Sequence, residues 1–187
     1  MQNITRWMLL VVLALAFSST VNSQSNSENA LREAQKAYQR GDYESAVKAF
    51  TAAIKVDPNH SMAYYGRGLA KHKMGDQDGA ISDYSESIRL DPRSKFALSN
   101  RGLLFLERKD FDAAIADFTG AIEADPALGS AYSNRGLVHQ QKGDHAKAIA
   151  DFTKAIEIGP DVAVAYNNRG TSKYLSRDFE EAIADFS

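Results

Sequence analysis

Apolar and polar residues follow one another along this chain with the period of an amphipathic α-helix, in short segments that recur at a fixed step of about 34 residues. One recurrence holds two such segments, at about 96–108 and 112–124, joined by a turn at 109–111. Helical spacing places Ala114 and Phe118 on one face of the second segment, and we expect that face to pack against the partner helix. The pattern predicts an all-α chain of helix-turn-helix units.

The prolines set the period. Each one follows the point where a second helix should end, because proline cannot continue a helix. Three other sets of residues recur at the same step of 34 residues, and we call each set of equivalent repeat positions a column. The proline column and these three are Pro58, Pro92, Pro126 and Pro160; Arg67, Arg101, Arg135 and Arg169; Gly68, Gly102, Gly136 and Gly170; and Ala46, Ala80, Ala114, Ala148 and Ala182.

One recurrence reads Tyr132-Ser-Asn-Arg-Gly136, Gly143-Asp144, Ala148-Ile-Ala-Asp-Phe152, Ala155-Ile156 and Pro160. It resembles the tetratricopeptide repeat, a helix-turn-helix unit of about 34 residues, over roughly residues 27 to 187. The resemblance implies a right-handed superhelical solenoid whose concave surface is lined by the first helix of each unit. We expect the solenoid to occupy residues 30–187, in units at 27–60, 61–94, 95–128 and 129–162 and a truncated one at 163–187.

Three sets of residues predict the packing and the turns. A mid-helix glycine column costs about 1 kcal/mol per residue relative to alanine, so we expect it to mark close helix approach. Turn glycines at Gly41, Gly75 and Gly143 are replaced by Lys109 and Arg177 in two units, and we expect those two turns to be slightly strained or differently shaped. An aromatic column is expected in the core, formed by Phe50, Tyr84, Phe118, Phe152 and Phe186.

The N-terminus has the three-part pattern of a secretory signal. Arg6 precedes an apolar run at 8–17, and a stretch of small and polar residues follows up to Ser23. We expect residues 1–23 to be a signal peptide cleaved after Ser23, and residues 24–29 to be a polar, disordered leader. The alternative is an uncleaved anchor, but the run falls well short of the roughly 20 residues that span a bilayer. The protein is therefore expected to be exported, to the periplasm or the medium.

Composition excludes several functions. The chain of 187 residues has 22 basic and 24 acidic residues, which leaves no basic footprint for nucleic acid. It has no cysteine, which excludes disulfides and thiol catalysis. Its 4 histidines are scattered over different repeat positions, and no phosphate-binding glycine loop is present. We expect no enzyme activity, no cofactor and no metal site.

A column of asparagines is the best candidate for ligand binding. Asn100, Asn134 and Asn168 lie on the helix face that the family turns inward, and an amide can donate to and accept from a peptide backbone. The column resembles the asparagine ladder of repeat domains that hold extended polypeptide, although Arg32 and Gly66 interrupt it here. Alternatively, these asparagines are helix-surface residues whose hydrogen bonds are made by water or by neighbouring repeats. The other candidates for the peptide-binding groove are Tyr65, Phe96, Leu103 and Leu137.

Each arginine of the repeat precedes an aspartate at a constant spacing of just under half the period. In an antiparallel hairpin those two positions come level, so we expect structural ion pairs, each worth about 0 to 1 kcal/mol when exposed. A row of anion-binding arginines is the alternative. The expected pairs are Arg67 with Asp83, Arg101 with Asp117, Arg135 with Asp151, and Arg169 with Asp185.

These features indicate a noncatalytic scaffold that binds a protein or an extended peptide outside the cytoplasm. Nucleic acid is not an expected partner, and neither is a membrane once the signal is cleaved. Two alternatives stay open. The chain could self-associate end to end through its uncapped C-terminal end, or it could be the repeat region of a longer enzyme or secretion-complex subunit.

Overall fold

A computed structural model of the protein describes residues 27–159 and 162–187, so the predicted signal peptide lies outside the described residues. Within these ranges the structure has ten helices and no strand, which confirms the all-α prediction. The first helix covers residues 27–39, so the prediction of a disordered leader was wrong for residues 27–29. The others are α2 (Tyr43–Val56), α3 (Ser61–Lys73), α4 (Gln77–Leu90), α5 (Lys95–Glu107), α6 (Phe111–Ala124), α7 (Gly129–Gln141), α8 (His145–Ile158), α9 (Val162–Leu175) and α10 (Phe179–Phe186).

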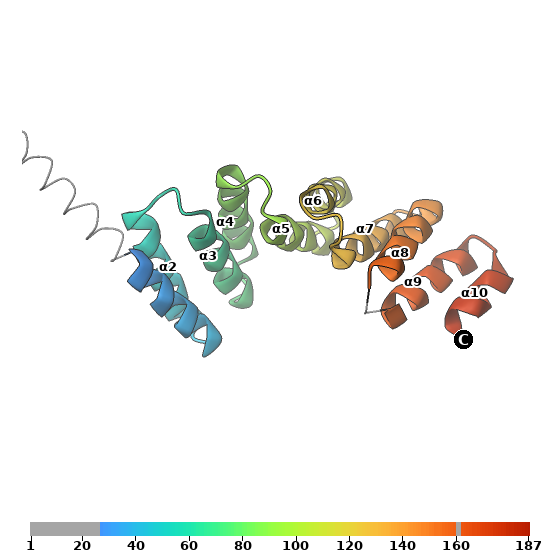
Figure 1. Cartoon of the computed structure of the whole chain (residues 1–187), viewed down its shortest axis with the longest axis horizontal. Coiled ribbons are helices and arrows are strands. Elements are labelled where there is room, and N and C mark those ends of the chain that lie inside the picture. Colours follow the sequence, from blue (N-terminus) through green and yellow to red (C-terminus); the bar gives the residue numbers. More distant parts are fainter. Residues whose placement is uncertain (1–26, 160–161) are drawn as a thin grey trace, which may run out of the picture. The chain divides into compact units, whose positions relative to one another are not determined.

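The helices follow one another as antiparallel hairpins, in two compact units (Figure 1). The first unit ends at Leu90 and holds the helix at 27–39 together with α2, α3 and α4. The second unit begins at Asp91 and holds the hairpins α5–α6, α7–α8 and α9–α10. In this second unit each hairpin packs on the next one, through α6 against α7 and α8 against α9. Among the described helices, none has both the length and the apolarity that crossing a membrane requires.

The turn within each hairpin has left-handed backbone geometry. Gly41, Gly75 and Gly143 have φ angles of 77°, 82° and 81°, which glycine adopts without steric cost. Lys109 and Arg177 adopt φ angles of 58° and 71° at the equivalent positions. Of the two outcomes expected for these turns, the structure has the strained one, because both residues keep the left-handed conformation that a side chain disfavours.

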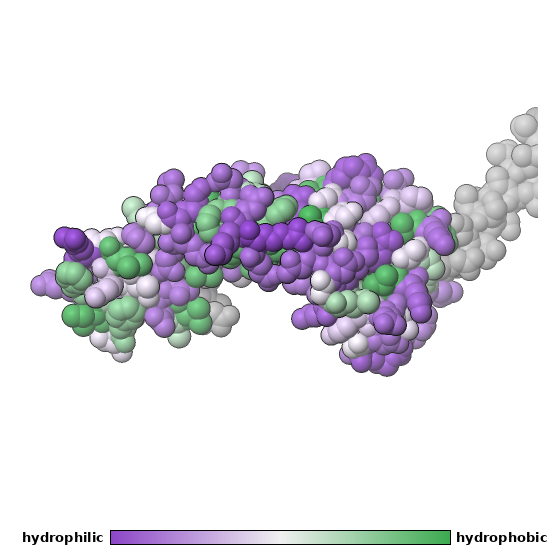
Figure 2. Space-filling model, turned by 180° about the vertical axis from the view of Figure 1, so that it is seen from behind, coloured by the Kyte–Doolittle hydropathy of each residue, from purple (hydrophilic) through white to green (hydrophobic). Residues whose placement is uncertain are grey.

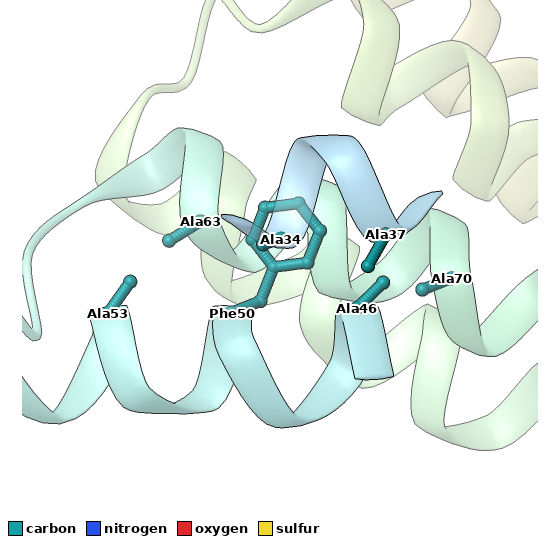
Figure 3. Packing of buried hydrophobic residues seen from close by; sticks show 7 residues of the cluster. All are labelled: Ala34, Ala37, Ala46, Phe50, Ala53, Ala63 and Ala70. Atoms are coloured by element: carbon teal, nitrogen blue, oxygen red, sulfur yellow. The ribbon is translucent and has the colours of Figure 1, made fainter. Parts of the chain in front are cut away.

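The core is built from small residues around one aromatic ring per hairpin. Figure 3 shows the ring of Phe50 rising from α2 toward the helix that carries Ala34, with further alanines around it. Phe50, Tyr84, Phe118 and Phe152 are all buried, with at most 7% of their surface exposed. The prediction was wrong for Phe186, which is 53% exposed. α8, which carries Phe152, packs against α9, whereas the described residues contain no later helix to pack against α10 in the same way.

The mid-helix glycines make room for these rings. A Cβ atom would lie 2.8 Å from the ring of Tyr84 at Gly68, 3.0 Å from Phe118 at Gly102, 2.9 Å from Phe152 at Gly136 and 2.7 Å from Phe186 at Gly170. These separations are shorter than ordinary van der Waals contact. The predicted close approach is confirmed, and the partner of each glycine is the aromatic ring on the second helix of the same hairpin.

Candidate peptide-binding groove

The three asparagines of the candidate ladder belong to the first helices of three consecutive hairpins in the second unit. Asn100 lies on α5, Asn134 on α7 and Asn168 on α9, and all three are half-buried. α7 contacts both α5 and α9. At the α7–α9 contact, the Nε2 of Gln140 donates to the backbone oxygen of Asn168 at 3.1 Å. The residues of the column therefore occupy matching positions on neighbouring helices.

The asparagine side chains are not equivalent. The Nδ2 of Asn100 donates to the carbonyl oxygen of Phe96, one turn earlier in its own helix, at 2.8 Å. The side chain of Asn134 forms no hydrogen bond with any residue that the structure describes. An amide that keeps its donors and acceptor is the one that a peptide backbone can engage without breaking a bond inside the protein. The side chain of Asn168 likewise forms no hydrogen bond with the described residues, so Asn134 and Asn168 are better placed than Asn100.

Asn134 also lies at a pocket between α7 and α9, with a volume of about 570 Å³. The polar part of the lining consists of hydroxyl and amide groups, and the rest is apolar. Ser130, Ser133 and Asn134 supply the polar part, and Leu128, Ile158 and Val164 are the largest apolar residues of the lining. Sequence reasoning did not identify this pocket as a site.

The apolar candidates differ in exposure. Phe96 is 53% exposed, and the Nζ of Lys95 lies 5.1 Å from the centre of its ring. Leu137 is half-buried. Leu103 packs against the buried cluster that contains Phe118 and Val138, so at least part of its side chain stabilises the hairpins. Of the three, Phe96 offers the most surface to a ligand.

Tyr65 belongs to a separate surface in the first unit. It lines a pocket of about 470 Å³ between the helix at 27–39 and α3, together with Tyr38, Met62 and Leu69. Its ring centre lies 6.0 Å from that of Tyr84. The column position that holds asparagine in the second unit is Gly66 here, so this pocket lacks the amide.

All four arginine–aspartate pairs are present as close ion pairs. The Nη2–Oδ1 distances are 2.7 Å for Arg67–Asp83, 2.7 Å for Arg101–Asp117, 2.8 Å for Arg135–Asp151 and 2.6 Å for Arg169–Asp185. Each is bidentate, since the Nε of the arginine also donates to Oδ2. The arginines are therefore engaged inside the protein and do not form an open row for anions.

Three of these arginines make a further contact that was not anticipated. The Nη1 donates to a threonine hydroxyl on the second helix of the preceding hairpin, in the pairs Arg67–Thr51, Arg135–Thr119 and Arg169–Thr153, at 3.0 to 3.1 Å. Each arginine thus ties its own hairpin to the one before it. The threonines recur in step with the repeat, so the period carried a signal that could have revealed them.

The Arg169–Asp185 ion pair raises the pKa of Arg169 and lowers that of Asp185. Hydrogen bonds from Arg169 lower the pKa of Asp185, and burial opposes this effect. The hydrogen bond to Asp151 raises the pKa of Arg135. These groups therefore stay charged and paired across the physiological range. In the described part of the chain, no three acidic or histidine side chains come together in a way that could hold a metal ion.

Comparison with known proteins identifies the fold. A family model described as Tetratricopeptide repeat matches residues 31–95, 71–129, 99–163 and 133–187. The crystal structure of MamA is similar, with a TM-score of 0.81 and 26% identity over 87% of this chain and 89% of that one. PilF of Pseudomonas aeruginosa has a TM-score of 0.76 and 20% identity, over 88% of this chain and 75% of that one. YrrB, described as a tetratricopeptide repeat protein with an unusual peptide-binding site, has a TM-score of 0.76 and 18% identity, over 91% and 88% of the two chains. No curated protein matches this sequence.

Proposed function

The chain belongs to the tetratricopeptide repeat family, and we propose that it is a noncatalytic scaffold that holds an extended peptide segment of a partner protein against α5, α7 and α9. The observation that carries the proposal is the placement of Asn100, Asn134 and Asn168 at matching positions on these three helices. Peptide groups recur along an extended ligand, and a repeated amide can pair with them whatever the ligand's side chains are.

The electrostatics of these helices support an uncharged mode of binding. The repeat arginines are bound to their aspartates, so they are not available to a ligand. Lys95 is likewise paired with Asp125 at 2.6 Å. Backbone recognition by amides, with apolar contacts beside it, requires no ligand charge.

The experiment is a triple substitution, Asn100→Ala, Asn134→Ala and Asn168→Ala. Binding is measured on a library of immobilised short peptides with degenerate, uncharged sequences. We expect binding to fall about tenfold or more, because loss of each ligand hydrogen bond costs about 0.5 to 1.5 kcal/mol. Asn59→Ala is the control, since Asn59 is exposed in the turn before α3. Equal binding by the wild type and the triple variant, with unchanged helicity, would refute the proposal.

The proposed site of action is outside the cytoplasm. The support is the sequence pattern of Arg6, the apolar run at 8–17 and the small residues up to Ser23. Intact-mass measurement of the exported protein tests it, with an expected mature N-terminus at Gln24. A chain that retains Met1 in a membrane fraction would contradict this part of the proposal.

Self-association is a second candidate, because the last hairpin exposes apolar side chains. Ile183 is 65% and Phe186 is 53% exposed, and Figure 2, seen from behind, shows hydrophobic surface at the end of the chain that carries α9 and α10. Apolar patches of this kind mark interaction surfaces. Sedimentation over a concentration series should show a larger species that Ile183→Glu abolishes. A wild-type monomer at all concentrations would exclude this candidate.

A further inference from the structure

The pocket between α7 and α9 has a chemistry that narrows the choice of ligand. We propose that it is a specificity site, which accepts one large apolar side chain of the bound peptide and excludes charged ones. The inference rests on the proposed function, because the peptide backbone beside the pocket is held by Asn134.

A comparison with the preceding pair of hairpins shows why the pocket is open. There, the Nζ of Lys95 at the start of α5 donates to the Oδ2 of Asp125 just before α7, at 2.6 Å. One repeat later, the equivalent positions are Gly129 and Gly159. Both glycines line the pocket. An ion pair that joins the two ends of the hairpin α5–α6 is thus replaced by two residues without side chains in the hairpin α7–α8.

A third substitution removes further volume at the same place. Phe96 follows Lys95 at the start of α5, and its equivalent in α7 is Ser130, which also lines the pocket. Met62 occupies this position in α3. α3 and α5 therefore carry large side chains where α7 carries the small side chain of Ser130. The pocket is open because three positions, those of Gly129, Ser130 and Gly159, hold small residues.

The side chains that line the pocket determine which ligand side chain can enter it. Its largest apolar residues come from three segments, with Leu128 before α7, Ile158 at the end of α8 and Val164 on α9. Among the residues that the structure describes, those that line the pocket have no ionisable side chain. A charged group would lose its hydration there without gaining a counter-charge, which is costly. A leucine, methionine or phenylalanine side chain would instead gain by leaving water.

The polar groups of the pocket place the peptide backbone. The side chains of Ser130 and Ser133, like that of Asn134, form no hydrogen bond with the residues that the structure describes. Their hydroxyl and amide groups are therefore available to the peptide groups on either side of the seated side chain. Apolar contact inside the pocket and hydrogen bonds beside it fit an amino-acid residue of an extended chain.

The test uses purified protein and libraries of short peptides, in which the central residue is fixed and the flanking residues are degenerate and uncharged. We expect leucine, methionine or phenylalanine at the centre to be retained about tenfold better than aspartate or lysine. Ser130→Phe, which restores the side chain of the preceding hairpin, should abolish this preference. Ser130→Ala, which keeps the pocket open, should preserve it. Gly129→Lys is a second filling variant, should Ser130→Phe fold poorly by circular dichroism.

The outcomes separate the inference from the function on which it rests. If the wild type retains no peptide, the proposed function fails and the inference fails with it. If the wild type retains peptides without preferring an apolar centre, or prefers a charged one, the inference alone is overturned. It is also overturned if folded Ser130→Phe and Gly129→Lys proteins show the same preference as Ser130→Ala. Asn134→Ala should weaken all peptides alike, without changing their ranking.

Discussion

The ring of Phe50 occupies the space that a side chain at position 66 would need, since a Cβ atom on Gly66 would lie 2.5 Å from the Cε1 of Phe50. In the following hairpins, the equivalent aromatic ring packs instead against a glycine on the first helix of the same hairpin, as Tyr84 packs against Gly68. The first helix has Ala34 at that position. The ring of Phe50 therefore packs toward the next hairpin, and Gly66 accommodates it.

This relationship predicts that Gly66→Asn, which would complete the asparagine column, destabilises the protein. Overpacking of a close-packed core typically costs about 1 to 3 kcal/mol, and we expect the free energy of unfolding in urea to fall by that amount. Adding Ala34→Gly gives the ring of Phe50 the space that Tyr84 has. The double variant should then recover part of the loss, as a coupling energy in a double-mutant cycle. Strict additivity of the two substitutions would contradict this account.

The same residues show how far the sequence alone could lead. The repeat period was enough for the helices, the turns and the close helix approach at the glycines, because each depends on positions that recur within one hairpin. It also led to a pairing of Arg135 with Asp151, which the structure contains. These features could be predicted because the same local geometry is repeated several times along the chain.

Departures from the repeat were harder to interpret. Gly66 was seen only as a gap in the asparagine column, because its contact with Phe50 crosses from one hairpin to the next. Gly129 begins and Gly159 ends the hairpin α7–α8, and their joint effect emerges only by comparison with the Lys95–Asp125 bridge between the two ends of the preceding hairpin. Such effects depend on departures at two positions, which no single set of repeat positions reveals.

Breaking one arginine–aspartate pair should cost far more than an exposed ion pair. The side chains of Arg135 and Asp151 are only 20% and 10% exposed, so Arg135→Met leaves a largely buried carboxylate without its partner. We expect a loss of about 3 kcal/mol in the free energy of unfolding, at the lower end of the range for buried pairs. Thr119→Val removes only the bond from Arg135 to the preceding hairpin and should cost about 1 kcal/mol.

A further variant tests whether the charge itself is responsible. Replacing both partners, as Arg135→Met with Asp151→Leu, leaves no unpaired charge and should be more stable than Arg135→Met alone. The measurement is the free energy of unfolding in urea of the wild type, Arg135→Met, Thr119→Val and the double variant Arg135→Met with Asp151→Leu. A loss in Arg135→Met no greater than that in Thr119→Val would show that the pair contributes as little as an exposed one.

His139 should make stability depend on pH. Burial lowers its pKa and outweighs the opposing effect of Asp151, whose Oδ2 lies 3.9 Å from Nε2. The unfolded chain, with the ordinary histidine pKa of about 6.5, therefore binds a proton more readily than the folded one. The resulting contribution to stability is fully present above about pH 6.5 and is lost as the pH falls below it.

The measurement is the free energy of unfolding of the wild type and of His139→Phe between pH 8 and pH 5.5. Phenylalanine is a natural choice, because Phe105 holds the equivalent position in α5. The variant should lose less stability than the wild type over this interval, and the other three histidines are common to both proteins. Parallel curves for the two proteins would exclude His139 as the source.

The turn at Lys109 offers a substitution that should stabilise the protein. Its φ of 58° costs a residue with a side chain about 1 to 2 kcal/mol, whereas Gly143 adopts 81° at the equivalent position without that cost. Glycine also gains freedom in the unfolded chain, so we expect Lys109→Gly to raise the free energy of unfolding by no more than about 1 kcal/mol. Gly143→Lys is the matched reverse change, and nothing lies within 4 Å of a Cβ atom there, so its cost is conformational. Opposite shifts of the urea midpoint are expected, and a shift of both variants in the same direction would refute the strain at this turn.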